Sequence, residues 1–502
     1  MISRTNSLTL TISQRSLVVQ AYIWLLAPLL LFLVNWFRWE ISIPVLILLG
    51  ASVAKVFCQK REGMLHFRNF RETDYEAVRI DRKWWLIMGL AAVYVFINGY
   101  GGFYYQIPYD NGYRNALMQD ISTHPWPVEY APLDGRPRLL SYYLGFWLAP
   151  ALIAKITGSL LIGEVSLLLY AIWGTWIALN FIHSLCGGRA LWSTLLIFIF
   201  FNIWDFPFRT VENYFLDPDY FQKFPFGHHD WIGLDFGCVG GAPSNRVMYG
   251  MSINQGPSTW VALMLMWHER RKLGNLLFNF ALLPLLAPFP AVCIIAYVGA
   301  KLILNFKKSI SLPNFAGMTV CLLILFYYLS NPRGEKPGVL EICGSSWVAF
   351  GITTAFTIVA YGVYLPFIWK EVKGSVLFWS MVVTAWLVPM VDLGSGDLGN
   401  RLSFSLVIYI MTLLSVKASR MKAGFSWRKV AFSAVFAVGA FLPVYQIGYC
   451  LLHELKCLRS GESVKSEWLL GHLDDKEANG DYLNFISEGE SFYSRYLMPH
   501  KN

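Results

Sequence analysis

Four carboxylates gather in one polar segment, residues 101–138, which lies between long apolar runs. Asp110 follows an aromatic and proline stretch and precedes Asn-Gly, which is a turn signal. The pattern over residues 113–121 suits a short helix, so Arg114 and Asn115 should lie just beyond Asp110. An apolar boundary disfavours the charged form of a carboxyl group, and such a group can act as a general base. Asp110 is therefore the candidate catalytic base, and Arg114 and Asn115 are candidates for substrate binding.

The same segment contains three further acids that are candidate site residues. Asp120 is a further candidate for substrate binding, and Glu129 and Asp134 are the next candidates for the base if Asp110 is not the residue used. The alternative is that all these acids only solvate a loop or cap helices, and composition by itself favours that alternative.

A second candidate site is the glycine-rich segment at residues 389–401, PMVDLGSGDLGNR, between two apolar runs. Its glycines allow a ligand to approach the backbone closely, and Arg401 should begin a helix. A guanidinium group makes bidentate hydrogen bonds to phosphate, and a helix N-terminus favours anions. The segment therefore predicts a phosphate site with Arg401, Asp397 and Asn400. The alternative is an interfacial arginine that pairs with Asp397.

The polar segment at residues 207–255 offers weaker chemistry. His228, His229 and Asp230 could bind a divalent cation, but adjacent histidines point in different directions on a strand and no third ligand has a fixed spacing. The cysteine spacing is not typical of zinc sites. The sequence therefore requires no cofactor, and a divalent cation remains an alternative. Two further substrate-binding candidates close this segment: Arg246 and Gln255.

The elements that must position these residues are apolar helices. The 502-residue chain is 55% hydrophobic and only 15% charged, whereas soluble domains carry about a quarter charged residues. Apolar runs long enough to cross a bilayer as helices recur along the chain. Aromatic residues, at 16%, suit the membrane–water interface. The composition therefore predicts an integral membrane protein.

The predicted fold is all-α and polytopic, with about 11–14 transmembrane or re-entrant helices. It divides into a membrane domain at residues 1–450 and a small extracytoplasmic tail at residues 451–502, which should pack on the outer face. The candidate spans are residues 17–36, 41–58, 84–100, 139–156, 159–183, 190–206, 256–268, 275–288, 289–305, 312–329, 346–368, 375–392, 402–417 and 427–450.

Basic residues predict the orientation. Residues 59–83, 268–274 and 417–429 are rich in Lys and Arg, and basic loops face the cytoplasm. These loops account for the net charge of +9 without a nucleic acid partner. Segments 101–138 and 207–255 should then face outward. Three apolar segments lie between these two loops although parity demands an even number of crossings, so one of them should be re-entrant, flat on the interface or broken.

Several stretches resemble a known family. They are DNGYRNALMQD at 110–120, LSYYLGFWLAPALIAK at 140–155, INQGPSTWVALML at 253–265, GSGDLGNRLSFSL at 394–406 and ESFYSRYL at 490–497. Together they resemble the GT-C glycosyltransferases, multi-pass membrane enzymes that use lipid-phosphate sugars, and more narrowly a group of uncharacterised bacterial membrane proteins with that fold. Each stretch is short, and the first is the most specific.

The resemblance implies a GT-C-like bundle with its active site in extracytoplasmic loops, in a bacterial cytoplasmic membrane. Family members use an Asp or Glu of the first external loop as the base, and Asp110 occupies that position. The resemblance further implies that Arg401 binds the leaving phosphate, with Arg114 or Arg246 as substitutes. The chain departs from the family pattern at residues 111–114, where aromatic and His positions are expected. The resemblance therefore does not extend to the acceptor.

The leading hypothesis is an inverting glycosyltransferase that moves a sugar from a polyprenyl-phosphate donor to an extracytoplasmic glycan or lipid. A transporter or flippase of a lipid-linked substrate, a glycan ligase or polymerase, and a non-catalytic assembly protein are the alternatives. A transporter usually carries ionisable residues at mid-membrane, for which Glu164 is a candidate. A transferase predicts instead that Asp110, Arg401 and the 207–255 segment converge on one outward cavity.

Overall fold

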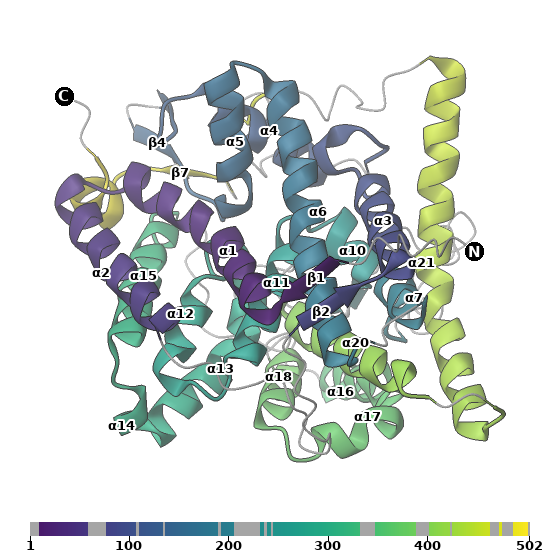
Figure 1. The fold of residues 1–502 in the computed structure, drawn as a ribbon. Helices are drawn as coiled ribbons and strands as arrows, with labels where there is room; N and C mark the ends of the chain where they lie inside the picture. Colours follow the sequence, from purple (N-terminus) through teal and green to yellow (C-terminus); the bar gives the residue numbers. More distant parts are fainter. Residues whose placement is uncertain are drawn as a thin grey trace, which may run out of the picture.

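A computed structural model describes the greater part of the chain, which is mostly helical there (Figure 1). The described residues are 10–58, 77–106, 110–133, 136–188, 192–204, 231–234, 238–241, 244–331, 347–387, 401–421, 424–461, 471–473 and 485–499. Three small antiparallel sheets join the helices, although an all-α protein was expected. The fold is therefore mostly, but not wholly, helical.

Within the described ranges, four helices are long and apolar enough to cross a membrane. They are α1 (Gln14–Trp36), α2 (Trp39–Cys58), α6 (Leu160–Leu185) and α21 (Trp427–Ser460). Large apolar side chains on these helices remain exposed, among them Ile47 on α2 at 68% and Leu452 on α21 at 61%. Exposed apolar surface of this extent marks contact with a membrane or another protein. The length, composition and exposed surface of these helices indicate a membrane-associated protein.

The remaining helices are shorter. Each apolar run in the sequence contains a helix, although α21 continues to Ser460 instead of ending at residue 450. The shorter helices are α3 (Arg82–Ile97), α4 (Asp110–Thr123), α5 (Gly145–Thr157), α7 (Trp192–Phe200), α10 (Asn245–Gly250), α11 (Gln255–His268), α12 (Leu276–Ala281), α13 (Pro288–Leu304), α14 (Phe306–Ser309), α15 (Leu312–Tyr328), α16 (Trp347–Gly362), α17 (Leu365–Val372), α18 (Val376–Leu387) and α20 (Phe404–Ser419), with the 3₁₀ turns η1 (Tyr100–Gly102) and η2 (Leu273–Asn275).

The three apolar segments between the two outward loops, where an even number of membrane crossings is required, contain α5, α6 and α7. Helix α7 is the shortest of the three. Its nine residues span about 14 Å, whereas a hydrocarbon core is about 30 Å thick. The non-helical backbone that follows packs against other helices. The Tyr364 hydroxyl donates to the Asn202 carbonyl oxygen at 2.7 Å, and Trp204 Nε1 donates to the Val435 carbonyl oxygen at 3.0 Å. The end of α7 is therefore a point where irregular backbone is stabilised by protein contacts, as broken membrane helices require.

Helices α11 and α20 form the centre of the bundle. Residues 255–267 of α11 and residues 404–416 of α20 are buried all round. A helix that is apolar on every face belongs in a core that other helices surround. Figure 1 accordingly shows α11 in the middle of the view, with α1 and α6 passing close to it.

The small sheets lie at distinct places in the chain. β1 (Leu10–Ser13) pairs with β2 (Ala77–Ile80), and β5 (Trp231–Leu234) pairs with β6 (Cys238–Gly241). The third sheet has the order β3 (Glu129–Leu133), β4 (Arg136–Leu140) and β7 (Ile486–Glu488). Arg138 in β4 is opposite Glu488 in β7, so this sheet joins the C-terminal segment to the first polar segment.

The two ends of the bundle differ in composition. In the view of Figure 1, α4, β4 and β7 lie at the upper end, while α14 and α17 lie at the lower end. Helices α14 and α17 carry Lys307, Lys308 and Lys370. The polar segment with the candidate base and a group of basic residues are therefore at opposite ends, as the positive-inside rule leads one to expect.

The C-terminal residues 485–499 are an integral part of this upper end. They include a π-helix, η7 (Tyr493–Leu497). The Tyr493 hydroxyl donates to the Trp36 carbonyl oxygen at 2.6 Å, and Arg38 Nε donates to the Met498 carbonyl oxygen at 2.9 Å. These contacts fasten the C-terminal segment to the corner between α1 and α2.

Candidate functional site

Helix α4 begins at Asp110 and carries Arg114 one turn later. Hydrogen bonds hold the first half of the helix in place: Asn111 Nδ2 donates to the Gly250 carbonyl oxygen at 3.2 Å, and Asn115 Nδ2 donates to Gln106 Oε1 at 2.8 Å. Arg114 is only 2% exposed, and its Nη1 lies 3.5 Å from Asn111 Oδ1. A guanidinium that is almost fully buried is costly unless it has partners, so this arginine marks a site.

Tyr142 and Tyr143 connect β4 to α5, and their rings lie 3.7 Å apart between centroids. The backbone N–H of Tyr142 donates to the Tyr327 hydroxyl at 3.1 Å. The Tyr142 ring also stacks on Phe485 at 4.1 Å, and the opposite neighbour of Phe485 is Tyr113 on α4, at 5.2 Å. The C-terminal segment thus supplies one ring of an aromatic stack that begins on α4.

Arg401 contacts this tyrosine pair, although it lies 258 residues further along the chain. Its Nη1 donates to the Tyr143 hydroxyl at 2.8 Å, and its guanidinium lies 5.8 Å from the centroid of Phe289. The charges of Arg114 and Arg401 both act electrostatically on the phenol of Tyr142.

Arg246 on α10 is 3% exposed. Its Nη1 donates to Asn98 Oδ1, and its Nη2 lies 3.0 Å from Cys450 Sγ. Gly250 allows this arrangement, because a Cβ atom there would lie 2.7 Å from Arg246 Nη1. Among the described residues these two hydrogen-bond partners are an amide and a thiol, and neither is a carboxylate.

Tyr100 is fully buried. Its hydroxyl donates to the Ile253 carbonyl oxygen at 2.8 Å. The charges of Arg114 and Arg246 both act electrostatically on its phenol. The three arginines of the site are Arg114, Arg246 and Arg401, and each acts on Tyr100 or Tyr142. We call this set the arginine cluster.

Gln255 begins α11 two residues after Ile253 and is fully buried. Within the described part of the chain, neither its Oε1 nor its Nε2 has a hydrogen-bond partner. Leaving a buried amide without partners costs about 1–3 kcal/mol. An unsatisfied buried polar group needs an explanation, and a side chain that awaits a ligand is one.

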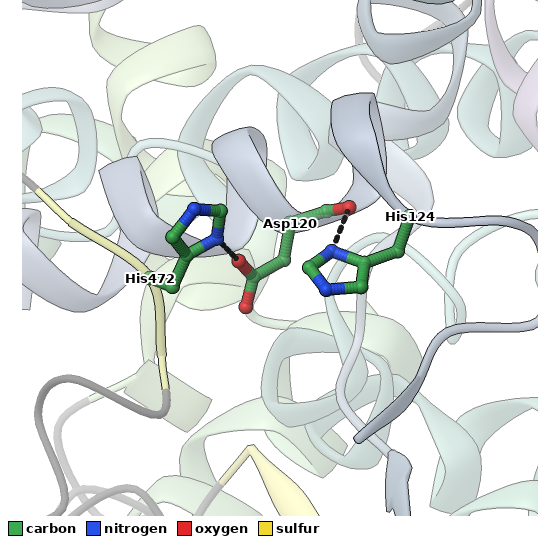
Figure 2. Close-up of side chains that lie close together, drawn as sticks. All are labelled: Asp120, His124 and His472. Carbon is green, nitrogen blue, oxygen red and sulfur yellow. Dashed lines mark hydrogen bonds and ion pairs between the residues drawn. The ribbon is translucent and has the colours of Figure 1, made fainter. Parts of the chain in front are cut away.

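A second polar group, shown in Figure 2, lies at the other end of α4. The carboxylate of Asp120 is fully buried. Its Oδ1 lies 2.5 Å from His472 Nδ1, and its Oδ2 accepts from the Tyr130 hydroxyl at 2.7 Å and from the Leu473 backbone N–H at 3.1 Å. His124 Nδ1 lies 3.2 Å from the Asp120 backbone oxygen. Asp120, predicted to bind substrate, therefore faces two imidazoles.

The structure brings together part of the set that the sequence indicates. The charges of Arg114 and Arg401 act on Tyr142, those of Arg114 and Arg246 act on Tyr100, and Asn115 supports the first half of α4. Asp110 begins α4, but its side chain lies outside the described residues, as do six further candidates. These are Asp134, His228, His229, Asp230, Asp397 and Asn400.

Three side chains of the site were not predicted. Tyr142 and Tyr143 stand in the stretch LSYYLG, where two tyrosines beside an apolar run were the available signal. His472 is isolated in a polar segment, and nothing in its neighbourhood indicates a partner. The four-residue spacing of Asp120 and His124 was a usable signal, because residues four apart share one helix face.

No protein-family model, no curated protein and no solved structure matches the chain. The fold and the site therefore define the class of protein by themselves. It is a mostly helical, membrane-associated protein with a buried arginine cluster.

Proposed function

We propose that the protein is an inverting glycosyltransferase that moves a sugar from a polyprenyl-phosphate donor to a glycan or lipid acceptor. The observation that supports this best is the burial of Arg114 and Arg401, which come from segments far apart in the chain. Arg401 donates to Tyr143, and the charges of both arginines act on the neighbouring Tyr142. Arginine is the residue best suited to phosphate, because its planar fork makes two charge-assisted hydrogen bonds. A membrane-associated chain that buries several arginines is suited to a lipid-linked phosphate.

Each part of the arginine cluster has a role in this proposal. Arg401 and Arg114 bind the donor phosphate, and their charge stabilises the negative charge that develops on the leaving phosphate. The Tyr143 hydroxyl orients Arg401 through their 2.8 Å hydrogen bond. Gln255 supplies an amide that can bind a sugar hydroxyl, since neither of its polar atoms has a partner among the described residues.

Asp110 is the proposed base, one turn before Arg114 on α4. Its carboxylate takes the proton of the acceptor hydroxyl while the hydroxyl oxygen forms a bond to the anomeric carbon. The bond between that carbon and the phosphate oxygen breaks, and polyprenyl phosphate leaves with the electron pair. Attack from the face opposite the phosphate inverts the configuration. This role depends on the position of Asp110 in the sequence and on the family resemblance.

The position of Glu164 argues against a transporter. Glu164 was the candidate for an ionisable residue at mid-membrane, but it lies in the second turn of α6, close to the start of that helix. A coupling residue in a transporter is expected deeper in the bilayer. The residues of the arginine cluster and the two tyrosines on which they act lie in η1, α4 and α10 and in the segments just before α5 and α20.

The test is release of polyprenyl phosphate from a panel of polyprenyl-phosphate sugars, with mixed glycan and lipid acceptors and purified full-length protein. We expect release with one donor, and a loss of at least about a hundredfold for Asp110→Asn. Release that survives this substitution would move the base to another acid. A donor that binds without being consumed in any acceptor mixture would contradict the transferase and favour a transporter or a ligase.

A further inference from the structure

We propose that Asp120, His124 and His472 bind one divalent transition-metal ion, with zinc as the metal that the donor set favours. Two imidazoles and one carboxylate are a ligand set of zinc centres that keep a fourth position open. Their potential ligand atoms all lie within 4.8 Å of one another. Within the described part of the chain, this is the group that combines histidine and carboxylate ligands in this way.

The arrangement in Figure 2 places the Asp120 carboxylate between the two imidazole rings. Asp120 and His124 come from the end of α4, and His472 comes from the C-terminal part of the chain. The two rings lie 5.7 Å apart between centroids and are nearly perpendicular, at 85°. They therefore flank the carboxylate and do not stack on each other, and each ring has a nitrogen within 4.8 Å of the ligand atoms of the other two residues.

The hydrogen bonds around the three residues are those that orient metal ligands. A histidine that binds a metal usually donates its other ring N–H to a carbonyl or carboxylate. His124 Nδ1 lies 3.2 Å from the Asp120 backbone oxygen, which leaves Nε2 as the ligand atom. Asp120 Oδ2 is held by the Tyr130 hydroxyl and the Leu473 backbone N–H. The carboxylate is therefore fixed by donors that do not occupy Oδ1.

His472 is oriented by a similar second contact. Its Nε2 lies 2.9 Å from the side-chain amide of Gln119. An amide can present either its NH₂ or its oxygen to a ring nitrogen, so Gln119 can support the ring in either protonation state. When Nδ1 binds a metal, the proton resides on Nε2 and can be donated to the amide oxygen.

Metal binding requires a small adjustment of His472. Zinc bonds to nitrogen and oxygen are about 2.0–2.2 Å long, so ligand atoms in a tetrahedral site stand roughly 3.4 Å apart. Without metal, His472 Nδ1 and Asp120 Oδ1 are 2.5 Å apart and form an ion pair or hydrogen bond. The side chain of His472 is 38% exposed and so has room to turn, whereas Asp120 is fully buried and stays in place.

Metal binding at this site would hold two distant segments of the chain together. A metal at this position joins α4, which carries Arg114 and Asp110, to residues 471–473 of the C-terminal part. The metal site goes beyond glycosyl transfer and does not depend on it, because it follows from the positions of the three ligands and of their hydrogen-bond partners. The alternative is that Asp120 and His472 form only an ion pair that fastens the same segments.

The experiment measures metal content and needs no substrate. Full-length protein in detergent is stripped with a chelator, dialysed against micromolar zinc and then against metal-free buffer, and its zinc is counted by mass spectrometry. We expect about one zinc ion per chain, and an affinity that falls about 10–100-fold in His124→Gln and His472→Gln. Replacement by Co²⁺ should give the visible absorption bands of a four-coordinate ion, which these variants should lose.

His453→Gln is the matched control, because His453 stacks on Tyr105 at 4.9 Å on α21 and belongs to no ligand group. It should bind zinc like the unmodified protein. An unmodified protein that retains no zinc would overturn the proposal and leave the ion pair. Equal zinc content in all three histidine variants would overturn it as well. Because the count does not involve donor turnover, a failed transferase assay and a failed zinc count are separate results.

Discussion

Near one end of α4 the charge of Arg114 acts on Tyr100 and Tyr142, and near the other end the carboxylate of Asp120 contacts His472 and Tyr130. Both charged groups are almost fully buried. Each carboxylate oxygen of Asp120 has a partner within the protein. In the arginine cluster, Arg246 Nε lacks a partner in the described part of the chain, and so do both polar atoms of Gln255.

This difference separates groups that hold the protein together from groups that receive a substrate. A satisfied buried polar network rigidifies a fold, whereas an unsatisfied one costs free energy. Groups that cost stability persist where function uses them. The end of α4 with Asp120 therefore suits a structural role, which the proposed metal ion would share, and the arginine cluster with Gln255 suits substrate binding.

The largest expected effect comes from the arginine cluster. Arg114→Gln and Arg401→Gln should each lower the rate of transfer about a hundredfold, because each removes a cation from the leaving phosphate. Their effects should not add in the double variant, since both arginines act on one phosphate. The measurement is polyprenyl phosphate release. Arg459→Gln, at the exposed end of α21, is the control and should retain the full rate.

A smaller effect on rate but a larger effect on stability is expected at Asp120. Asp120→Ala leaves the Tyr130 hydroxyl and the Leu473 backbone N–H without their acceptor. We expect a loss of about 2–3 kcal/mol in the free energy of unfolding, measured by thermal unfolding in detergent. An unchanged melting temperature would mean that Asp120 does not stabilise the contact between α4 and residues 471–473.

Tyr130→Phe tests one bond of that network alone. It removes the 2.7 Å hydrogen bond to Asp120 Oδ2 and keeps the ring. The expected loss is about 1 kcal/mol in the free energy of unfolding, with donor affinity unchanged. A drop in donor affinity without a change in stability would reverse the assignment of the two ends of α4.

The smallest effect on stability, and the one of opposite sign, is expected at Gln255. Gln255→Leu replaces a buried amide that has no partner in the described part of the chain by an apolar side chain of similar size. Stability should stay equal or rise by up to about 1 kcal/mol, while donor affinity falls about tenfold. Lower stability with unchanged affinity would show that Gln255 has a structural role instead.

The helices were predictable because their signal is local. A run of apolar residues such as 312–329 exceeds what a soluble helix needs, and α15 occupies Leu312–Tyr328. A short helix was also predicted over residues 113–121, and α4 extends beyond it at both ends, from Asp110 to Thr123. The short strands β4 and β7 were not predicted, because each has only a few residues and their pairing joins segments far apart in the chain.

The arginines of the site were predicted one by one, but their arrangement was not. Arg114, Arg246 and Arg401 were each singled out as charges beside apolar runs, since a charge there is costly and so informative. The sequence did not indicate that their charges act on Tyr100 and Tyr142. Nor did it indicate that His472 reaches Asp120, because an isolated histidine in a polar segment carries no pattern.

The sequence by itself therefore determined the apolar helices and which charged residues deserve chemical interpretation, because both follow from the free energy of single segments in lipid or water. Only the tertiary structure decided which of these residues lie together. The pairing of β4 with β7, the ring contact of Phe485 with Tyr113 and the hydrogen bond from the Leu473 N–H to Asp120 bring the C-terminal part of the chain to β4 and α4. Contacts of this kind depend on packing between remote segments, and no local pattern encodes them.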